Sequence, residues 1–527
     1  MSEASRNNER PLTSLPDSPP KPLPTRAIEV PKTETTSGWM FWVAAVGIMV
    51  IGLVLRWYAG TTEFWMDEIW TWELSQTAKH PWQVFQIKHD NNHLLNTLVV
   101  YLLGPDQPWM VYRIPTMIAG VLSIPVAGAI FWDQHRGRAV LLMLLVATNY
   151  QLIHYGSEAR GYGYLILFSL LSVWLAQRSM ASQRPINDCL FAFVALLGFA
   201  SHSTYIFCFL AIASWFAYRW STDRALQSHA LGSLIRCSAI PLVFLMWLYF
   251  SVTSEMTIGG GEGRSIIDAV SKLLTSTFGG HAEGWWNVRL VGGLGATAIL
   301  IGLAVLWRAE SEWAVLYASA LIFVPALILI LLKPQLLYTR YFLVQIIFLL
   351  MLLTQGAIWL WERNRIGAVS TSLALLLVLS GNVASTWNLV NLDRGHYREA
   401  IALMLTDNVA GERLPEDAAL HSVTISSDYD MRHAMIIRFY QRQLDPQNRI
   451  RYVMGADIPE TGVDWMLMHD GAFEFQPELQ WSDIHGNQYG LVQTYRYCGA
   501  SGWVLAVYRK QTPMANRTTQ SVSGVTR

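Results

Sequence analysis

Long apolar runs recur along the chain from residue 39 to about residue 383, separated by short polar connections. A helix that crosses the hydrocarbon core of a bilayer needs roughly 17 to 25 mostly apolar residues. Runs near this length are Trp39–Leu55, Trp109–Phe131, Ala139–Ile153, Tyr162–Leu175, Pro185–Ser201, Ser203–Tyr218, Ser238–Val252, Leu290–Leu306, Trp313–Leu332, Tyr341–Leu360 and Ile366–Val383. The pattern predicts about eleven crossings, and the shorter run His93–Leu103 is predicted to be half-embedded.

The segment before the first apolar run is polar and rich in Pro, Ser and Thr. It has no apolar face to bury, so residues 1–38 are predicted to form a disordered tail. A cleaved signal peptide is not indicated, because a signal has its apolar core directly behind a basic start.

From about Trp387 the composition becomes that of an ordinary soluble domain. His396–Leu405 has a helical pattern, and Ala419–Ser426, Trp465–His469 and Gly502–Arg509 have strand patterns. This alternation predicts a small α/β domain. The predicted fold class is therefore a polytopic α-helical membrane protein, with a membrane domain over residues 39–386 and a C-terminal soluble α/β domain over residues 387–527.

Composition supports this class and excludes others. Hydrophobic residues make up 52% of the chain and charged residues 14%, whereas about a quarter of a soluble protein is charged. The formal net charge of zero gives no basic surplus, so no nucleic-acid partner is expected. The four cysteines are scattered without metal-ligand spacing, and neither a disulfide nor a structural zinc site is expected from them.

Arginines in short loops orient the predicted crossings, because basic residues favour the cytoplasmic side. The arginines that fall on one side are Arg136, Arg138, Arg178, Arg184, Arg219, Arg224, Arg308, Arg363 and Arg365. The N-terminus is then cytoplasmic, while loops 58–108 and 255–287 and the C-terminal domain face outward from the cell (inner) membrane.

The residues of chemical interest all fall on that outer face. An acidic pair, Asp67-Glu68, follows the first crossing and is flanked by Trp65, Trp70 and Trp72. Charge at a membrane boundary is costly unless it is used. A channel or carrier is expected to hold ionisable groups near the bilayer midplane, so clustering at one surface favours an enzyme at the outer interface.

Several motifs appear together in an order found in one superfamily. They are Asp67-Glu68 in a long first outer loop, Asp90-Asn-Asn-His93, Tyr112-Arg113, Tyr155-Gly-Ser-Glu158-Ala-Arg160-Gly-Tyr162, Ser201-His-Ser-Thr-Tyr205 and Tyr338-Thr-Arg340-Tyr341. With the soluble C-terminal domain, this order resembles the GT-C-fold glycosyltransferases, which include protein O-mannosyltransferases and aminoarabinose transferases. The resemblance implies inverting transfer of a sugar from a polyprenyl-phosphate donor to a hydroxyl of a lipid, glycan or protein acceptor.

Such a transfer needs a carboxylate to accept the acceptor proton and positive charge to stabilise the departing phosphate. The resemblance gives Asp67 the first role, and Glu68 is a neighbour that orients it or helps to bind a cation. The alternative is structural, because two acids at this position suit the N-terminus of a helix.

Asp90 and His93 stand three residues apart before an apolar helix, where they can share one face and contribute to a divalent metal site for Mg, Mn or Zn. The family more often has His-Pro-Pro where this chain has His93-Leu94-Leu95, which weakens any carried-over role. The alternatives are a helix cap for Asp90 and a headgroup position for His93. Lys88 is nearby and is a candidate for phosphate binding or for snorkelling to the interface.

Glu158, Arg160 and Arg340 complete the predicted donor site. By resemblance Glu158 faces the donor or the catalytic aspartate, and Arg160 faces the phosphate. Arg340 enters an apolar helix on the same side, and its planar guanidinium fits a phosphate. The plain alternatives are an interfacial salt bridge for Glu158 with Arg160, and contact with lipid headgroups for Arg340. Lys333 and His202 are weaker candidates.

The glycine-rich stretch 258–264 lacks the preceding strand and the lysine-hydroxyl ending of a phosphate-binding loop. It is predicted to be a flap over the site or a plain connection, followed by an amphipathic helix over Ile266–Phe278. Two other function classes stay open, a lipid or polysaccharide transporter and a non-catalytic envelope-assembly protein. A transporter would tolerate loss of the Asp67 charge, and in an assembly protein the C-terminal domain would matter more than the first loop.

Overall fold

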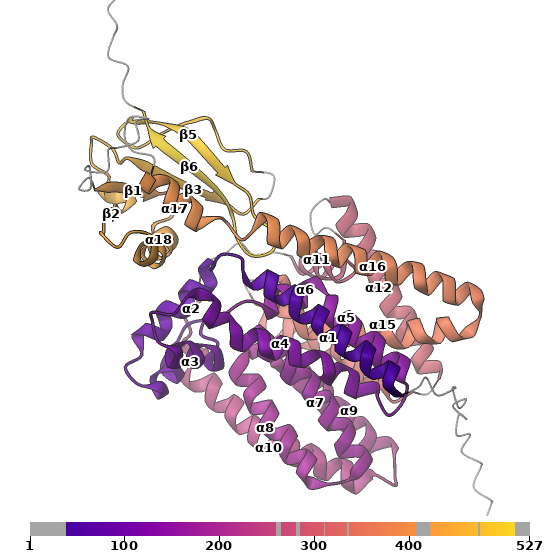
Figure 1. The fold of residues 1–527 in the computed structure, drawn as a ribbon. Helices are drawn as coiled ribbons and strands as arrows, with labels where there is room; N and C mark the ends of the chain where they lie inside the picture. The colour runs from indigo at the N-terminus through magenta and orange to yellow at the C-terminus, as the bar shows by residue number, and fades with distance from the viewer. Residues whose placement is uncertain are drawn as a thin grey trace, which may run out of the picture.

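The computed structural model describes residues 38–259, 265–280, 285–309, 311–334, 337–406, 422–472 and 475–511. The predicted tail over residues 1–37, most of the predicted flap and the start of the predicted strand at Ala419 lie outside these residues. The described chain forms a large helical part followed by a sheet domain, which sits beyond one end of the helices (Figure 1).

The helical part runs from α1 to α16. Its helices are α1 (Gly38–Gly60), α2 (Met66–Thr77), α3 (Leu94–Leu103), α4 (Trp109–Phe131), α5 (Arg136–Thr148), α6 (Tyr150–Gly156), α7 (Tyr162–Ser182), α8 (Pro185–Ser201), α9 (Ile206–Thr222), α10 (Gln227–Ser251), α11 (Ile266–Thr277), α12 (Trp285–Arg308), α13 (Trp313–Ala318), α14 (Val324–Leu332), α15 (Leu343–Arg363) and α16 (Arg365–Leu392). The predicted amphipathic helix after the flap is confirmed as α11, whose N-cap Ser265 accepts a hydrogen bond from the Asp268 backbone.

Among the described residues, eight helices are long and apolar enough to cross a membrane, or nine if α5 and α6 count as one bent span. The predicted count of about eleven is not confirmed. Helices α8 and α9 account for the two predicted crossings beyond nine, and with 17 residues each they lie at the lower limit of the length that spans a bilayer. At 1.5 Å per residue such a helix is about 26 Å long, slightly less than a hydrocarbon core of about 30 Å.

The run predicted as one crossing at Ala139–Ile153 is instead broken, with a bend of 57° between α5 and α6. Asn149 causes the break by accepting a hydrogen bond from the Leu152 backbone and capping α6. The guanidinium of Arg56 donates to the carbonyl oxygens of Val146 and Ala147 at the end of α5, at 3.1 Å each. Carbonyls freed by a break in an apolar surrounding must be satisfied by protein groups, and Arg56 serves that purpose.

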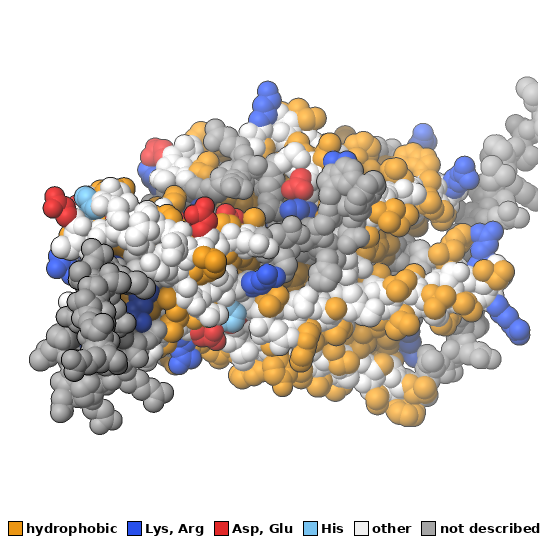
Figure 2. Space-filling view, turned by 90° about the horizontal axis from the view of Figure 1, so that it is seen from above, with side chains coloured by type: hydrophobic (Ala, Val, Ile, Leu, Met, Phe, Trp, Pro, Cys, Tyr) orange, Lys and Arg blue, Asp and Glu red, His pale blue; other side chains and the backbone are white. Residues whose placement is uncertain are grey.

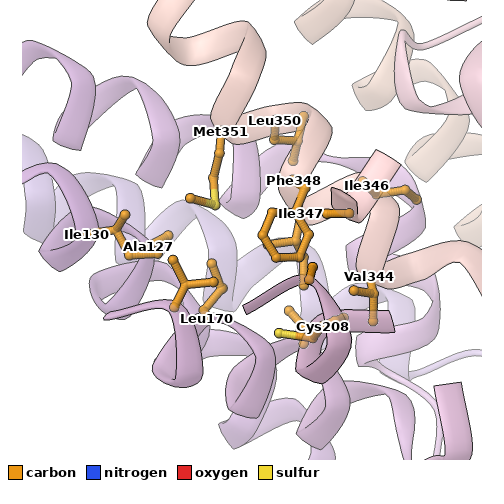
Figure 3. Close-up of a cluster of buried hydrophobic side chains, with 14 of the residues drawn as sticks. Ala127, Ile130, Leu170, Cys208, Val344, Ile346, Ile347, Phe348, Leu350 and Met351 are labelled. Carbon is orange, nitrogen blue, oxygen red and sulfur yellow. The ribbon is translucent and has the colours of Figure 1, made fainter. Parts of the chain in front are cut away.

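Helix α15 contributes a large share of the core of the helical part, and Figure 3 shows several of its buried side chains. Its residues Val344–Met351 are all buried. In Figure 3, Phe348 and Met351 point toward Ala127 and Ile130 of α4 and toward Leu170 of α7. Apolar helices without an outward polar face are the expected interior elements of such a bundle.

The C-terminal domain has a six-stranded mixed sheet in the order β2-β1-β3-β6-β5-β4. The strands are β1 (Val423–Ser427), β2 (Ile450–Tyr452), β3 (Trp465–Asp470), β4 (Gln480–Ser482), β5 (Gln488–Tyr495) and β6 (Val504–Lys510), and the helices are α17 (Tyr397–Thr406) and α18 (Asp430–Leu444). Strands β2, β1 and β3 are parallel, and the remaining neighbours are antiparallel. A C-terminal sheet domain is confirmed, and α17, β3 and β6 match the predicted helix and the last two predicted strands. Strand β1 covers the described end of the strand predicted from Ala419. The boundary predicted near Trp387 falls inside α16, which continues to Leu392.

This domain packs on the short segment between α1 and α2, residues 61–65. Phe64 stacks on Phe439 of α18 with ring centroids 5.3 Å apart, and the Tyr440 hydroxyl donates to the Phe64 carbonyl oxygen at 2.8 Å. Trp65 and Trp503 are in ring contact at 5.7 Å. The segment that carries Asp67 is therefore fixed from both sides.

The surface differs between the two ends of the molecule. Hydrophobic side chains spread over the helical part, as a membrane-embedded surface requires (Figure 2). At the end of the helices away from the sheet domain, the charged side chains visible in this view are Lys and Arg. The architecture is that of a polytopic helical membrane protein.

Candidate functional site

The two residues of the acidic pair have different surroundings, although both lie in the first turn of α2. The Glu68 side chain is fully buried. Its carboxylate accepts hydrogen bonds from Nε of Arg113 and from the Ala159 backbone at 2.7 Å each, and from the Trp65 backbone at 3.2 Å. The helix-capping role considered for the pair falls to Glu68, and nothing from solvent reaches its carboxylate.

Asp67 points the other way, toward two arginines. Its Oδ2 lies 2.7 Å from Nη1 of Arg160 and 3.2 Å from Nη1 of Arg340. The Asp67 side chain is 14% exposed, and those of Arg160 and Arg340 are 4% and 15% exposed. Three residues that are far apart in the sequence, and that were each predicted as site residues, are thus brought together in the helical part.

The ion pairs leave two buried donors of the cluster without a partner. Asp67 Oδ2 is contacted by both guanidinium groups, but Nε of Arg160 and Nε of Arg340 are buried and have no hydrogen-bond partner within the described part of the chain. Buried polar atoms are usually satisfied, and an exception calls for a specific explanation such as a ligand. Guanidinium donors without a partner beside a carboxylate suit an anion together with a group that gives up a proton.

Asn91 holds this cluster in place from the loop before α3. Its amide nitrogen donates to the Asp67 carbonyl oxygen at 2.7 Å, and its amide oxygen accepts from Nη2 of Arg160 at 2.8 Å. Asn91 stands within the Asp90-Asn-Asn-His93 motif, but the sequence predicted no role for it. Because one side chain contacts both Asp67 and Arg160, it fixes their relative position.

His93 lies on the other side of Arg160. Its Nε2 is 3.1 Å from Nη2 of Arg160, and its ring stacks on His202 with centroids 4.8 Å apart. Burial, followed by the positive charge of Arg160, keeps the pKa of His93 well below its usual range. Burial also lowers the pKa of His202 to about 3. Both imidazoles are therefore neutral, so the side of the cluster next to Arg160 is polar but uncharged.

Glu158 does not face Asp67. It is fully buried and pairs with Arg394, while it also accepts a hydrogen bond from the Ser501 hydroxyl at 2.9 Å. The nearest approach of Arg160 to its carboxylate is 3.9 Å. Burial alone would raise the pKa of Glu158, but the Arg394 charge and the hydrogen bond from His154 hold it well below its usual range. Glu158 links the helical part to the C-terminal domain through Arg394 and Ser501.

Lys88 and Asp90 lie on a segment that pairs with the residues following α10, around Thr257. Lys88 forms an ion pair with Glu255, and both side chains are well exposed. The Asp90 backbone donates to the Thr257 carbonyl oxygen at 3.0 Å, and the Asp90 side chain lies 3.1 Å from Nδ1 of His89. The described start of the predicted flap, up to Gly259, thus packs on the Asp90 loop.

The predicted metal pair, Asp90 and His93, gains no third ligand from the described residues. The set there that can hold a metal ion is Asp428, His433 and His469, in the C-terminal domain. Two guanidinium groups face Asp67 Oδ2, and one faces His93 Nε2. Positive charge already occupies these positions, so the cluster of Asp67, Arg160, Arg340 and His93 does not fit a divalent ion. A possible metal site is therefore present, but not where the sequence placed it.

One cleft among the described residues lies away from this cluster. It has a volume of about 610 Å³ and runs between the ends of α1 and α4 and helix α18. Trp57, Trp72, Trp109, Phe439 and Arg442 are among its lining residues. The Arg442 guanidinium lies 4.8 Å from the Trp72 ring centroid.

Glu63 is a buried acid that the sequence analysis did not single out. Its carboxylate accepts the Arg398 backbone N–H at 3.1 Å, and its own backbone N–H donates to Asp393 at 2.9 Å. Burial and the nearby Asp393 charge raise the pKa of Glu63 to about 8 from its ordinary value of 4.5.

This shift predicts a pH dependence of stability. The folded protein keeps a proton that the unfolded chain releases, so the contribution of Glu63 to the free energy of unfolding is complete below pH 4.5 and is lost as pH rises through about 8. Glu63→Gln is expected to reduce the fall in melting temperature between about pH 6 and about pH 9. Thermal unfolding of both proteins in the same detergent measures this. An unchanged pH profile in the variant would assign the dependence to other groups.

Other central residues were also missed by sequence reasoning. Arg113 and Arg394 are fully buried partners of Glu68 and Glu158. An arginine in the first turn of an apolar helix was a usable signal for Arg113, because such a charge needs a partner. Arg394 carried no comparable signal, since it follows α16 in a segment of ordinary soluble composition.

Comparisons with known proteins give fold-level similarity alone. No family model matches the chain, and no curated protein sequence matches it. Three similar solved structures are of an oligosaccharyltransferase from Archaeoglobus fulgidus. The first, solved with zinc and sulfate, is 11% identical over 81% of this chain and 68% of that one, with a TM-score of 0.44. The second, an apo form, is 12% identical over 82% and 70%, with a TM-score of 0.44.

The third is the archaeal oligosaccharyltransferase AglB in complex with an inhibitory peptide and a dolichol-phosphate. It is 11% identical over 82% of this chain and 69% of that one, with a TM-score of 0.45. AglB is a GT-C-fold glycosyltransferase, the class that the ordered motifs of the sequence resemble. Because identity and TM-score are both low, the functional argument rests on the site itself.

Proposed function

We propose that this protein is an integral-membrane glycosyltransferase. It moves a sugar from a polyprenyl-phosphate donor to a hydroxyl acceptor at the extracytoplasmic face of the cell membrane. One observation carries the proposal. A buried carboxylate oxygen of Asp67 lies between Arg160 and Arg340, and buried guanidinium donors beside it have no hydrogen-bond partner in the described chain. A carboxylate and an anion-binding pair at a membrane boundary are the two groups that this reaction requires.

In the proposed reaction the acceptor hydroxyl attacks the anomeric carbon while the bond from that carbon to the phosphate oxygen breaks. Asp67 takes the proton of the hydroxyl as general base. Arg160 and Arg340 bind the phosphate and stabilise the negative charge that grows on it as it leaves. Displacement in one step inverts the anomeric centre, as the resemblance implies. Asn91 and Glu68 position the reacting groups but take no part in bond formation or proton transfer.

The donor class follows from the proposed sidedness. Nucleotide sugars are made and kept in the cytoplasm, while the proposed site faces outward, on the side away from the arginine-rich loops. A sugar carried on a membrane lipid reaches such a site by diffusing in the bilayer. The acceptor is left open among a lipid, a glycan and a protein, since no described contact selects one.

A direct assay separates this function from its alternatives. Purified protein in lipid nanodiscs is expected to turn over a radiolabelled polyprenyl-phosphate sugar in the presence of envelope extract, and to leave the matching nucleotide sugar unused. Turnover of the nucleotide sugar alone would refute the proposal. Movement of the lipid across the bilayer without cleavage of the sugar–phosphate bond would instead identify a transporter.

The role of Arg340 gives a second prediction. Hydrogen bonds to charged groups contribute about 1.5–3 kcal/mol, so Arg340→Gln is expected to raise the KM for the donor by about 10- to 100-fold. The turnover number should change less, because Arg160 still faces the phosphate. Lys333→Gln is a matched control, since it removes an exposed positive charge from the same connection before α15. An unchanged KM in Arg340→Gln would remove Arg340 from the donor site.

A further inference from the structure

A second cluster of ionisable side chains lies in the C-terminal domain, apart from the Asp67 site. Strands β1 and β3 are parallel neighbours, so their carboxyl ends meet at one edge of the sheet. Asp428 follows β1, His469 lies near the end of β3, and His433 lies in the first turn of α18. The topology brings three side chains to one edge from three separate elements.

Their ligand atoms are close together. Nδ1 of His469 lies 2.9 and 3.0 Å from the two carboxylate oxygens of Asp428, and Nδ1 of His433 lies 3.6 Å from Oδ1 of the same residue. All three ligand atoms lie within 4.8 Å of one another. One ion placed between them can therefore contact an oxygen and two nitrogens after small side-chain adjustments.

His433 supplies independent evidence for a ligand. It is 1% exposed, and neither of its ring nitrogens has a hydrogen-bond partner in the described chain. Every imidazole carries at least one N–H and, when neutral, one lone pair. Leaving such a buried group unpaired costs about 1–3 kcal/mol. An imidazole nitrogen with a free lone pair is the group that binds a metal ion.

We propose that Asp428, His433 and His469 form a binding site for a divalent transition metal ion of the zinc class. Two imidazoles and one carboxylate suit zinc and its neighbours in the first transition row, whereas calcium and magnesium prefer sets made of oxygen atoms. The proposal does not depend on the proposed transferase activity.

Arg432 competes with the ion in this arrangement. Its Nη1 lies 2.8 Å from Nε2 of His469. A guanidinium only donates, so this Nε2 carries the lone pair and the ring proton is on Nδ1, facing Asp428. An ion bound at Nδ1 requires the other tautomer, with the proton on Nε2. The Arg432 guanidinium must then move away from His469. It can remain in contact with the rings of Tyr429 and Trp503, whose centroids lie 4.4 and 4.8 Å from it in this structure.

The site is coupled to the region of Asp67 through aromatic contacts. The His469 ring lies 5.2 Å from that of Trp503, and Trp503 lies 5.7 Å from Trp65. Trp65 directly precedes α2, whose first turn carries Asp67. A bound ion would therefore stiffen the edge of the sheet domain that packs on the segment between α1 and α2.

Metal titration of the full-length protein tests the proposal. The protein is prepared without a histidine tag, treated with a chelator, and titrated with Co²⁺, whose visible absorption reports nitrogen ligands, and with Zn²⁺ by calorimetry. We expect one ion per chain. His433→Gln and His469→Gln are expected to weaken binding by at least about tenfold, the lower end of what even an outer-shell change costs. His485→Gln is the matched control, because its ring contacts the Ile458 carbonyl oxygen in the same domain.

A variant that is expected to bind the metal ion more tightly distinguishes a specific effect on the site from unfolding of the protein. Arg432→Gln removes a competing charge and offers an amide oxygen to the Nε2–H of His469, so Co²⁺ should bind about tenfold more tightly, as expected for one charge at a distance of several ångström. Absence of binding in the unmodified protein would overturn the proposal. So would binding that is unaffected by His433→Gln and His469→Gln, or an Arg432→Gln protein that binds Co²⁺ no more tightly.

Discussion

Asp67→Asn is expected to lower the turnover number by about 10²–10⁴, the usual contribution of a general base. Asparagine keeps the shape of the side chain but removes its basicity. The Asp67 backbone is held independently by Asn91 and by the Thr71 hydroxyl, which donates to the Asp67 carbonyl oxygen at 3.0 Å. The capping contact at this helix start is made by Glu68. The variant should therefore fold, and the loss should appear in turnover measured with the lipid-linked donor.

The matched control is Asp106→Asn, which neutralises an exposed acid in the connection between α3 and α4. It should leave turnover unchanged. Thermal unfolding of each variant separates loss of chemistry from loss of structure. Near-normal turnover in Asp67→Asn would place the base elsewhere, with Asp90 as the next candidate because its side chain is 26% exposed while that of Glu158 is fully buried.

Glu68→Gln is expected to lower the free energy of unfolding by about 3–5 kcal/mol, as is typical when one partner of a buried ion pair is removed. Arg113 would be left fully buried without its carboxylate, and the Ala159 backbone would lose a charged acceptor. The activity that remains per folded molecule should be close to normal. Thermal unfolding in detergent, combined with turnover corrected for the folded fraction, measures both quantities.

An exposed ion pair provides the contrast. Glu255→Gln breaks the contact with Lys88, and its melting temperature should stay unchanged because both side chains are well exposed. The double variant Glu68→Gln with Arg113→Met should cost less than the sum of the two single variants, because the charges are then removed together. A Glu68→Gln protein of normal stability that has lost turnover would give Glu68 a direct part in the reaction.

The residues of the site were predicted better than their partners. Asp67 and Arg340 were identified from the cost of charge at a membrane boundary and Arg160 from the resemblance, and the structure brings both arginines to Asp67. The resemblance also placed Glu158 beside the donor or the catalytic aspartate, whereas the structure pairs it with Arg394, which follows it by more than two hundred residues. Burial cost predicts that a charge has a partner, but it does not predict which one.

The sequence by itself determined the class of the protein and the positions of its apolar helices, because the length of a hydrophobic run and its flanking residues are local properties. It also indicated the alternation of helix and strand after residue 387. Tertiary structure decided which acid of the pair is exposed, why α5 and α6 are bent, and which histidines meet Asp428. Each of these depends on contacts between distant segments, such as Arg56 with the end of α5 and β1 with β3. Such pairings are fixed by packing and by the need to satisfy buried polar groups, which no local pattern records.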